Sequence, residues 1–195
     1  MPRNPEDGRK ATILVPLAVM IVVGAFFLLG CILTVLFRLP FELGLSPPFR
    51  LLGVALVTIA VAIWIWLLQY RRPTDVLIST YATFSKLLRR AELKQDLGRK
   101  ERLVVRGPYK WVRHPMYLAV LLSIVGWGLL LDLTFILLAA LVALPWFNFV
   151  VMPYEEKELV ALFGRDYEDY MKRVHRLLPI RLNSTGREQV DEARS

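Results

Sequence analysis

The stretch PMYLAVLLSIVGWGLLLDLTFILLAALVALPWFNFVVM, residues 115–152, is almost uniformly apolar, and its single charged residue, Asp132, separates two hydrophobic runs. About 20 helical residues cross a hydrocarbon core of roughly 30 Å, so the run 134–152 suffices for a transmembrane helix and the run 116–131 is slightly short. The link between them is so short that the two helices must form an antiparallel hairpin, with Asp132 at its turn.

Two further runs without Asp, Glu, Lys or Arg precede the hairpin, at residues 11–37 and 51–70. Hydrophobic residues make up 55% of the chain, yet the formal net charge is +8, so the charges are segregated from the apolar runs. The first run is about twice as long as the apolar core of a signal peptide, which indicates a retained helix. The sequence therefore predicts an all-α membrane protein with four transmembrane helices, forming one domain over residues 1–195.

The distribution of Lys and Arg predicts the orientation of these helices. Basic residues are dense in 71–114, in the N-terminal tail and after Met152, whereas the two opposite loops hold only Arg38 and Arg50. Basic loops stay on the cytoplasmic side, so both termini and the central loop are expected there. The positive charge also suits contact with anionic membrane lipids. Nucleic-acid binding is disfavoured, because the basic residues adjoin apolar spans and no nucleic-acid-binding motif is present.

Amphipathic segments are expected at the cytoplasmic surface. Residues 75–93 place apolar side chains at helical spacing, and residues 159–174 do the same, with an interruption or cap near Gly164. Between them, the charged stretch 95–102 is a candidate lid or exposed loop. The polar tail 183–195 is predicted to be disordered.

The chemistry-bearing residues cluster around the hairpin. Arg113 and His114 stand directly before Pro115, and a proline in the first helical turn leaves backbone N–H groups that favour a carboxylate or phosphate. The alternative is that Arg113 and His114 merely reach the membrane interface. Upstream, Gly107-Pro108-Tyr109 is a turn signal that brings backbone close to a ligand.

A second candidate cluster is Glu155-Glu156, which follows the last apolar run. Adjacent helical residues diverge by about 100°, so one carboxylate is free to face a ligand while the other pairs with a loop arginine. The alternative is a helix that simply emerges into water. Two histidines, His114 and His175, and one cysteine, Cys31, give no metal site.

These pieces together resemble a known family. The run GPYKWVRHPMY (residues 107–117), the apolar hairpin, Glu155-Glu156 and LVALFGRDYEDYMKRVHRLLP (residues 159–179) are similar to integral-membrane S-adenosylmethionine-dependent methyltransferases. That family includes isoprenylcysteine carboxyl methyltransferases and phospholipid N-methyltransferases. The resemblance covers residues 103–179, which it marks as the catalytic region, and it implies a C-terminal site for S-adenosylmethionine.

The resemblance also implies roles for individual residues. Binding of the amino-acid end, ribose or amino group of the cofactor is implied for Gly107, Tyr109, Arg113, His114, Tyr117 and Glu155. A catalytic or acceptor-side role is implied for Arg173, Arg176 and Glu156, although either Glu155 or Glu156 is a candidate for the cofactor contact. Two positions depart from the family pattern, His175 where proline or glycine is frequent and Ala119 where glycine is common.

Methyl transfer from a sulfonium is an in-line displacement that needs alignment and a water-poor site rather than a metal. The expected acceptor is lipid-like or prenylated, and both carboxyl oxygen and amine nitrogen stay open as its methylated atom. Two other functions stay open as well: a sterol-type membrane reductase using a nicotinamide cofactor, which normally has more spans, and a non-enzymatic membrane adaptor. Binding of S-adenosylhomocysteine separates the three. The oligomeric state is not predicted.

Overall fold

The structure is a computed structural model that describes residues 5–70, 103 and 105–178. Its elements are α1 (Pro5–Leu36), α2 (Pro47–Tyr70), the 3₁₀ turn η1 (Gly107–Lys110), α4 (Pro115–Leu131), α5 (Thr134–Trp146), the π-helical turn η2 (Phe147–Val151), α6 (Met152–Phe163) and α7 (Arg165–Arg173). The described residues form no β-strand, and an isolated bridge pairs Glu42 with Leu133. The helical fold expected from the sequence is confirmed.

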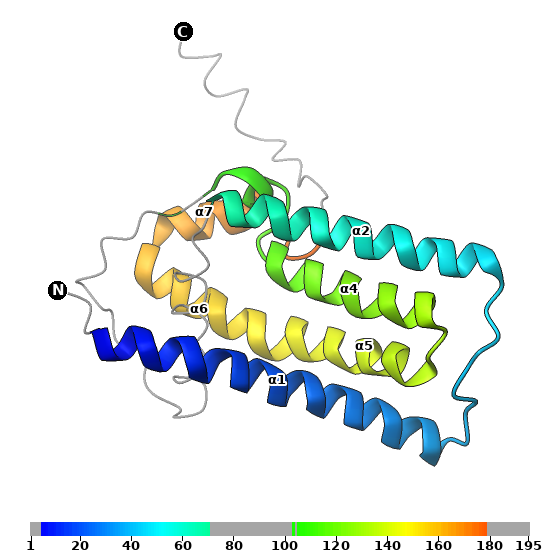
Figure 1. The fold of residues 1–195 in the computed structure, drawn as a ribbon. Helices are drawn as coiled ribbons and strands as arrows, with labels where there is room; N and C mark the ends of the chain where they lie inside the picture. Colours follow the sequence, from blue (N-terminus) through cyan, green and yellow to red (C-terminus); the bar gives the residue numbers. More distant parts are fainter. Residues whose placement is uncertain (1–4, 71–102, 104, 179–195) are drawn as a thin grey trace, which may run out of the picture.

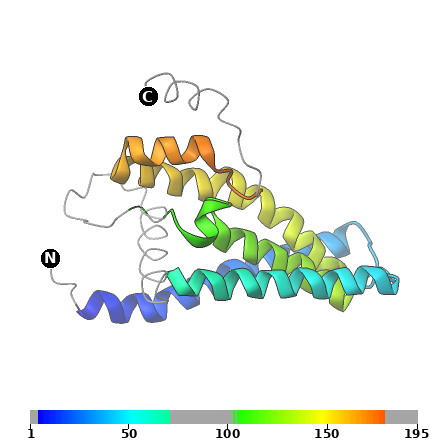
Figure 2. The ribbon, with the colours of Figure 1, turned by 90° about the horizontal axis from the view of Figure 1, so that it is seen from above.

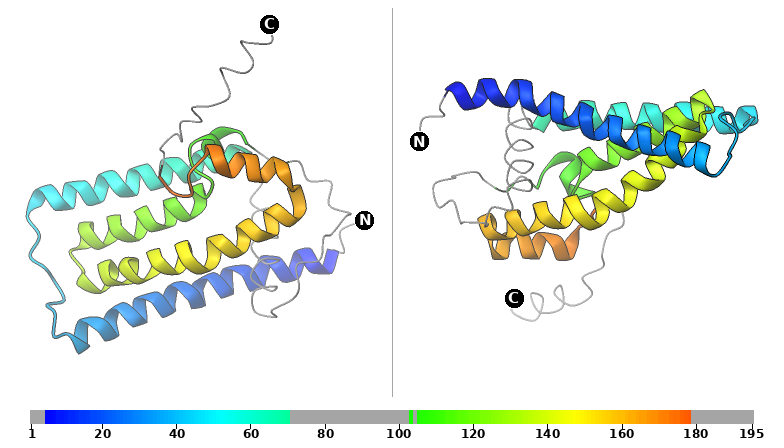
Figure 3. Two further views of the ribbon diagram at one scale, coloured as in Figure 1. Left: turned by 180° about the vertical axis from the view of Figure 1, so that it is seen from behind. Right: turned by 90° about the horizontal axis from the view of Figure 1, so that it is seen from below.

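The hairpin of α4 and α5 lies between the two N-terminal helices (Figure 1). Helix α1 packs against α5, and α2 packs against α4, so the order across the bundle is α1, α5, α4, α2. Helices α5 and α6 run on as one oblique rod, which takes α6 and α7 out of the plane of α1 and α2 (Figure 2). Helix α7 then folds back beside α6 (Figure 3). Helix α2 ends, and α4 begins, at this same end of the bundle.

Two helices within the described residues are long and apolar enough to cross a membrane, Pro47–Tyr70 and the continuous rod Thr134–Phe163. The segments Met20–Leu36 and Pro115–Leu131 are apolar but shorter. The rod extends beyond the expected span 134–152, so Glu155 and Glu156 stand on the same helix as the apolar run. Four spans and the cytoplasmic orientation stay predictions.

Glycines allow the central helices to approach closely. A Cβ atom on Gly53 of α2 would lie 2.7 Å from the carbonyl oxygen of Gly126 on α4. Conversely, a Cβ on Gly126 would lie 3.0 Å from the carbonyl oxygen of Gly53. Small residues allow such close packing where the backbones of two helices meet.

Asp132 occupies the turn between α4 and α5, as predicted, and it also fixes the loop between α1 and α2. Its backbone is left-handed, with φ of 58°, and the residue is 2% exposed. Its carboxylate accepts backbone N–H groups from Leu43 at 3.2 Å and Leu45 at 3.0 Å, and it pairs with Arg50 at 3.2 Å. Next to it, Thr134 donates through its hydroxyl to the Pro40 carbonyl at 2.6 Å. The loop between α1 and α2 is therefore joined to the α4–α5 turn at the end of the bundle away from α6 and α7.

The predicted helical segment 159–174 is present and interrupted where expected. Helix α6 ends and α7 begins at Gly164, whose φ is +57°. Expectations for residues 75–93, 95–102 and 183–195 lie outside the described residues.

Candidate functional site

The turn before α4 lies against the end of α2. Gly107 has a positive φ of 61°, and a Cβ atom there would collide with the ring of Tyr70, so only glycine fits without rearrangement. Pro108 follows in the first turn of η1 and is buried. The turn expected at Gly107-Pro108-Tyr109 is confirmed.

The chain after α7 turns back onto this loop. Helix α7 ends at Arg173 because Val174 takes an extended conformation, with φ of −127° and ψ of 130°. The N–H of Arg113 then donates to the carbonyl of His175 at 2.8 Å, and the N–H of His114 donates to the carbonyl of Arg176 at 3.0 Å. Two backbone hydrogen bonds thus bring the segment after α7 alongside Arg113 and His114.

Aromatic packing holds the same segment in place. Tyr167, Tyr170 and Val174 form a buried cluster, against which Leu159 and Phe163 of α6 also pack. The cluster also contacts the loop before α4, because the Tyr170 hydroxyl donates a hydrogen bond to the Tyr109 carbonyl at 2.6 Å. The apolar residues of 159–174 therefore hold the segment after α7 against the loop before α4.

Glu156 is the centre of the charged cluster. Its carboxylate is contacted by Arg113 Nη1 at 3.0 Å, by His114 Nε2 at 3.2 Å and by Arg176 through Nε at 3.0 Å and Nη2 at 2.6 Å. Glu156 is only 6% exposed. The loop before α4, helix α6 and the segment after α7 therefore meet at one carboxylate.

The charges at this centre reinforce one another. Burial alone would raise the pKa of Glu156, but hydrogen bonds from His114 and Arg176 and the charge of Arg113 outweigh it and hold the pKa at about 2. Burial alone would lower the pKa of His114, but its contacts with Glu155 and Glu156 outweigh that effect and raise it. The ionised form of Glu156 and the protonated form of His114 are both favoured.

Three buried polar atoms beside the cluster have no hydrogen-bond partner among the described residues: Arg113 Nε, Glu155 Oε2 and the Tyr154 hydroxyl. Glu155 Oε2 lies 3.5 Å from His114 Nδ1, an ionic contact without a hydrogen bond. Buried polar atoms are nearly always hydrogen-bonded, so a cationic donor and a carboxylate oxygen that lack a hydrogen bond point to a polar ligand.

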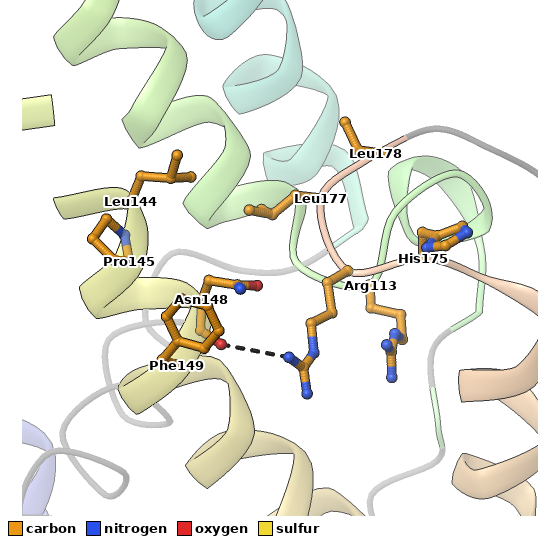
Figure 4. Close-up of a pocket in the computed structure, with 9 residues that line it drawn as sticks. Arg113, Leu144, Pro145, Asn148, Phe149, His175, Leu177 and Leu178 are labelled. Carbon is orange, nitrogen blue, oxygen red and sulfur yellow. Dashed lines mark hydrogen bonds between the residues drawn. The ribbon is translucent and has the colours of Figure 1, made fainter. Parts of the chain in front are cut away.

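A cavity of about 690 Å³ adjoins the cluster (Figure 4). Leu144, Pro145 and Phe149 lie on one side of it, and Leu177 and Leu178 on the other. Its polar lining residues are Arg113, Asn148, His175 and Arg176. An apolar cavity with a charged end suits an amphiphilic molecule.

The structure brings most of the predicted site residues together. Arg113, His114, Glu156 and Arg176 make the central contacts. Around them lie Glu155, Tyr109, Gly107 and Tyr117, whose ring centroid is 5.7 Å from that of His114. Arg173 is not part of the cluster: it is exposed, and its Nε donates to the carbonyl of Asp169 in its own helix at 3.1 Å.

Sequence reasoning missed Tyr154, Asn148 and the apolar walls of the cavity. The contribution of Asn148 is a backbone carbonyl, 3.4 Å from Arg176 Nη1, so its side-chain type carries no signal. The nearest signal in the sequence is a pair of prolines, Pro145 and Pro153, which predicts an irregular helix between them.

Comparison with known proteins adds a family match. The family model for phospholipid methyltransferase matches residues 49–166. A probable protein-S-isoprenylcysteine O-methyltransferase of Oryza sativa subsp. indica is 36% identical over 80 residues, which are 41% of this chain and 42% of the relative. Protein-S-isoprenylcysteine O-methyltransferase of Schizosaccharomyces pombe is 32% identical over 113 residues, 57% of this chain and 45% of the relative.

A third relative is methanethiol S-methyltransferase 1 of Bradyrhizobium diazoefficiens, which is 36% identical over 74 residues, 37% of this chain and 25% of the relative. The chain thus spans less than half the length of these curated relatives. No solved structure matches it.

Proposed function

This chain belongs to the phospholipid methyltransferase family, and we propose that it transfers a methyl group from S-adenosylmethionine to a lipophilic acceptor at a membrane surface. The observation that carries the proposal is the buried cluster around Glu156, together with two buried atoms beside it that lack a hydrogen bond, Arg113 Nε and Glu155 Oε2. The relatives named above are methyltransferases, which supports the reaction class.

The residues present fit the cofactor. S-Adenosylmethionine has a carboxylate, an ammonium group and ribose hydroxyls, and when bound it supplies a methyl group activated by a sulfonium. Arg113 Nε is a buried cationic donor suited to the carboxylate. Glu155 Oε2 is a buried acceptor suited to the ammonium group or a ribose hydroxyl. Glu156 orients Arg113 and His114, because both contact its carboxylate.

The cavity fits a lipophilic acceptor. Its volume of about 690 Å³ lies in the range of small-molecule sites, and its walls are largely leucine, proline and phenylalanine. Two relatives are named for isoprenylcysteine, an acceptor with a long apolar chain. Leu144 and Leu177 would line the apolar part of such an acceptor, while Arg113 and Arg176 face its polar end.

These residues act on the reaction by orientation and by exclusion of water. Displacement at the methyl group needs an aligned nucleophile in a site where water does not compete. An ionised carboxylate acceptor would need only orientation. An amine or thiol acceptor would also have to lose a proton to a base. The site is cytoplasmic in this proposal, which the Lys and Arg residues of 71–114 and of the segment after Met152 support.

The decisive experiment is calorimetric titration of the detergent-solubilised protein with S-adenosylhomocysteine. We expect saturable binding by the wild type, a loss of at least tenfold in affinity for Arg113→Ala, and no change for Lys172→Ala, whose side chain is 72% exposed. No binding by the wild type would refute the proposal. Binding of a nicotinamide dinucleotide instead would favour the reductase alternative.

A further inference from the structure

The rod Thr134–Phe163 contains one turn that is not α-helical. In η2 the backbone N–H of Met152 donates to the carbonyl of Phe147, five residues earlier rather than four. Pro153 follows directly, and in an α-helix its ring would collide with the carbonyl of Phe149. The wider π turn avoids that collision at Pro153.

The π turn changes the direction in which the rest of the rod points its side chains. Ala140 is buried on the inner face of α5. At about 100° per residue, an uninterrupted α-helix would place Glu156 almost opposite Ala140, on the outer face. The one extra residue of a π turn rotates Glu156 back to the inner side, where it meets Arg113 and His114.

The π turn also leaves one carbonyl for the cluster. The N–H of Met152, which would pair with the Asn148 carbonyl in an α-helix, pairs with Phe147 instead. The next residue along, Pro153, has no N–H to offer. The Asn148 carbonyl instead accepts from Arg176 Nη1 at 3.4 Å, while Nε and Nη2 of the same arginine hold Glu156.

We propose that Pro153 and the π turn are positioning elements of the cofactor site, acting through Arg176. The turn aims Glu156 inward, and the Asn148 carbonyl holds the guanidinium that fixes Glu156 in place. This inference rests on the proposed function, because it assumes that the Glu156 cluster is the cofactor site. Neither Pro153 nor Asn148 needs to touch the cofactor.

The test is Pro153→Ala, which supplies a backbone N–H that can pair with the Asn148 carbonyl, five residues earlier, while the π turn is kept. The Asn148 carbonyl then gains a donor inside the helix, and Arg176 loses one of its three anchors. We expect about fivefold weaker binding of S-adenosylhomocysteine by calorimetry, or ~1 kcal/mol, which corresponds to one weak charge-assisted hydrogen bond. Removing a proline from a helix interior favours folding, so a folding defect is not expected.

A double-mutant cycle distinguishes positioning through Arg176 from a general effect on the helix. Arg176→Lys keeps the charge but loses the planar fork that contacts both Glu156 and Asn148. In that background, Pro153→Ala should cause no further loss of affinity. Where binding by Arg176→Lys is too weak to measure, the same cycle is read from melting temperatures without ligand.

The control is Pro16→Ala, which removes a proline from the interior of α1 and should leave affinity unchanged. Equal affinity of Pro153→Ala and wild type would overturn the inference, as would additive losses in the cycle, while leaving the cofactor site intact. Absence of binding by the wild type would instead refute the proposed function from which the inference starts.

Discussion

Replacing Glu156 by glutamine tests the centre of the site, because it removes the charge and keeps the shape of the side chain. In the wild type the carboxylate is 6% exposed and contacts two arginines and a histidine. Arg113, whose side chain is 11% exposed, would be left buried without a counter-charge. Arg176 is 34% exposed and regains part of its hydration.

Breaking a buried ion pair by removing one partner costs about 3–5 kcal/mol, and the partial exposure of Arg176 places Glu156→Gln near the lower end, at about 3 kcal/mol. For a chain of this length, that corresponds to a fall of ~6–12 °C in melting temperature. Thermal unfolding in detergent near neutral pH measures it directly. The matched control, Glu168→Gln, alters an exposed glutamate of α7 and should change stability by less than about 0.5 kcal/mol.

The pH dependence gives an independent check on the same variant. The pKa of Glu156 is lowered from 4.5 to about 2, so the stability it contributes is present above pH 4.5 and is lost as the pH falls towards 2. The melting temperatures of wild type and Glu156→Gln should therefore converge in acid. A Glu156→Gln protein that melts within about 2 °C of wild type at neutral pH would show that the cluster is not held by this charge.

Four other outcomes are expected. The stability advantage of wild type over His114→Gln should be full below pH 6.5 and should disappear as pH rises through the raised pKa of His114, measured by melting temperature across pH. Arg173→Ala should leave S-adenosylhomocysteine affinity within about threefold, since Arg173 lies outside the cluster. If Arg173 orients the acceptor, the same substitution should lower turnover in methylation assays with a long-chain acceptor. In a cysteine-free background, Leu45→Cys should react with an impermeant reagent from outside intact cells and Lys110→Cys should not; the reverse would overturn the orientation. Asp132→Ala should destabilise by about 3 kcal/mol in denaturant unfolding, because it leaves two loop N–H groups and Arg50 without their acceptor.

The hairpin was predictable because charge is so scarce there. A lone Asp132 between two apolar runs leaves few places for a turn, and the structure puts the turn at that residue. Helix geometry predicted that one of Glu155 and Glu156 pairs with a loop arginine, and Glu156 contacts Arg113. Only the family resemblance put His114 in the same site as these glutamates, since 42 residues separate His114 from Glu156. Hydrophobic periodicity predicts local structure and not a contact between residues so far apart in the sequence.

Other features depend on backbone geometry that residue type does not encode. The resemblance implied an acceptor-side role for both Arg173 and Arg176. The helix ends between them, so one side chain stays on α7 while the other reaches Glu156. The π turn has no hydrophobic signature of its own, and the carbonyl of Asn148 is common to every residue type. The order of the four helices also follows from packing at glycines such as Gly53 and Gly126, not from their order in the chain.

The position of the α4–α5 hairpin between α1 and α2 has a consequence for how the chain assembles. During synthesis α1 and α2 leave the ribosome first, yet their main packing partners are α5 and α4, which emerge later. We therefore expect the first two helices to stay apart until the second hairpin packs between them. The loop at residues 37–46 can close over Asp132 only at that stage. The contact between this loop and Asp132 should therefore form late in folding.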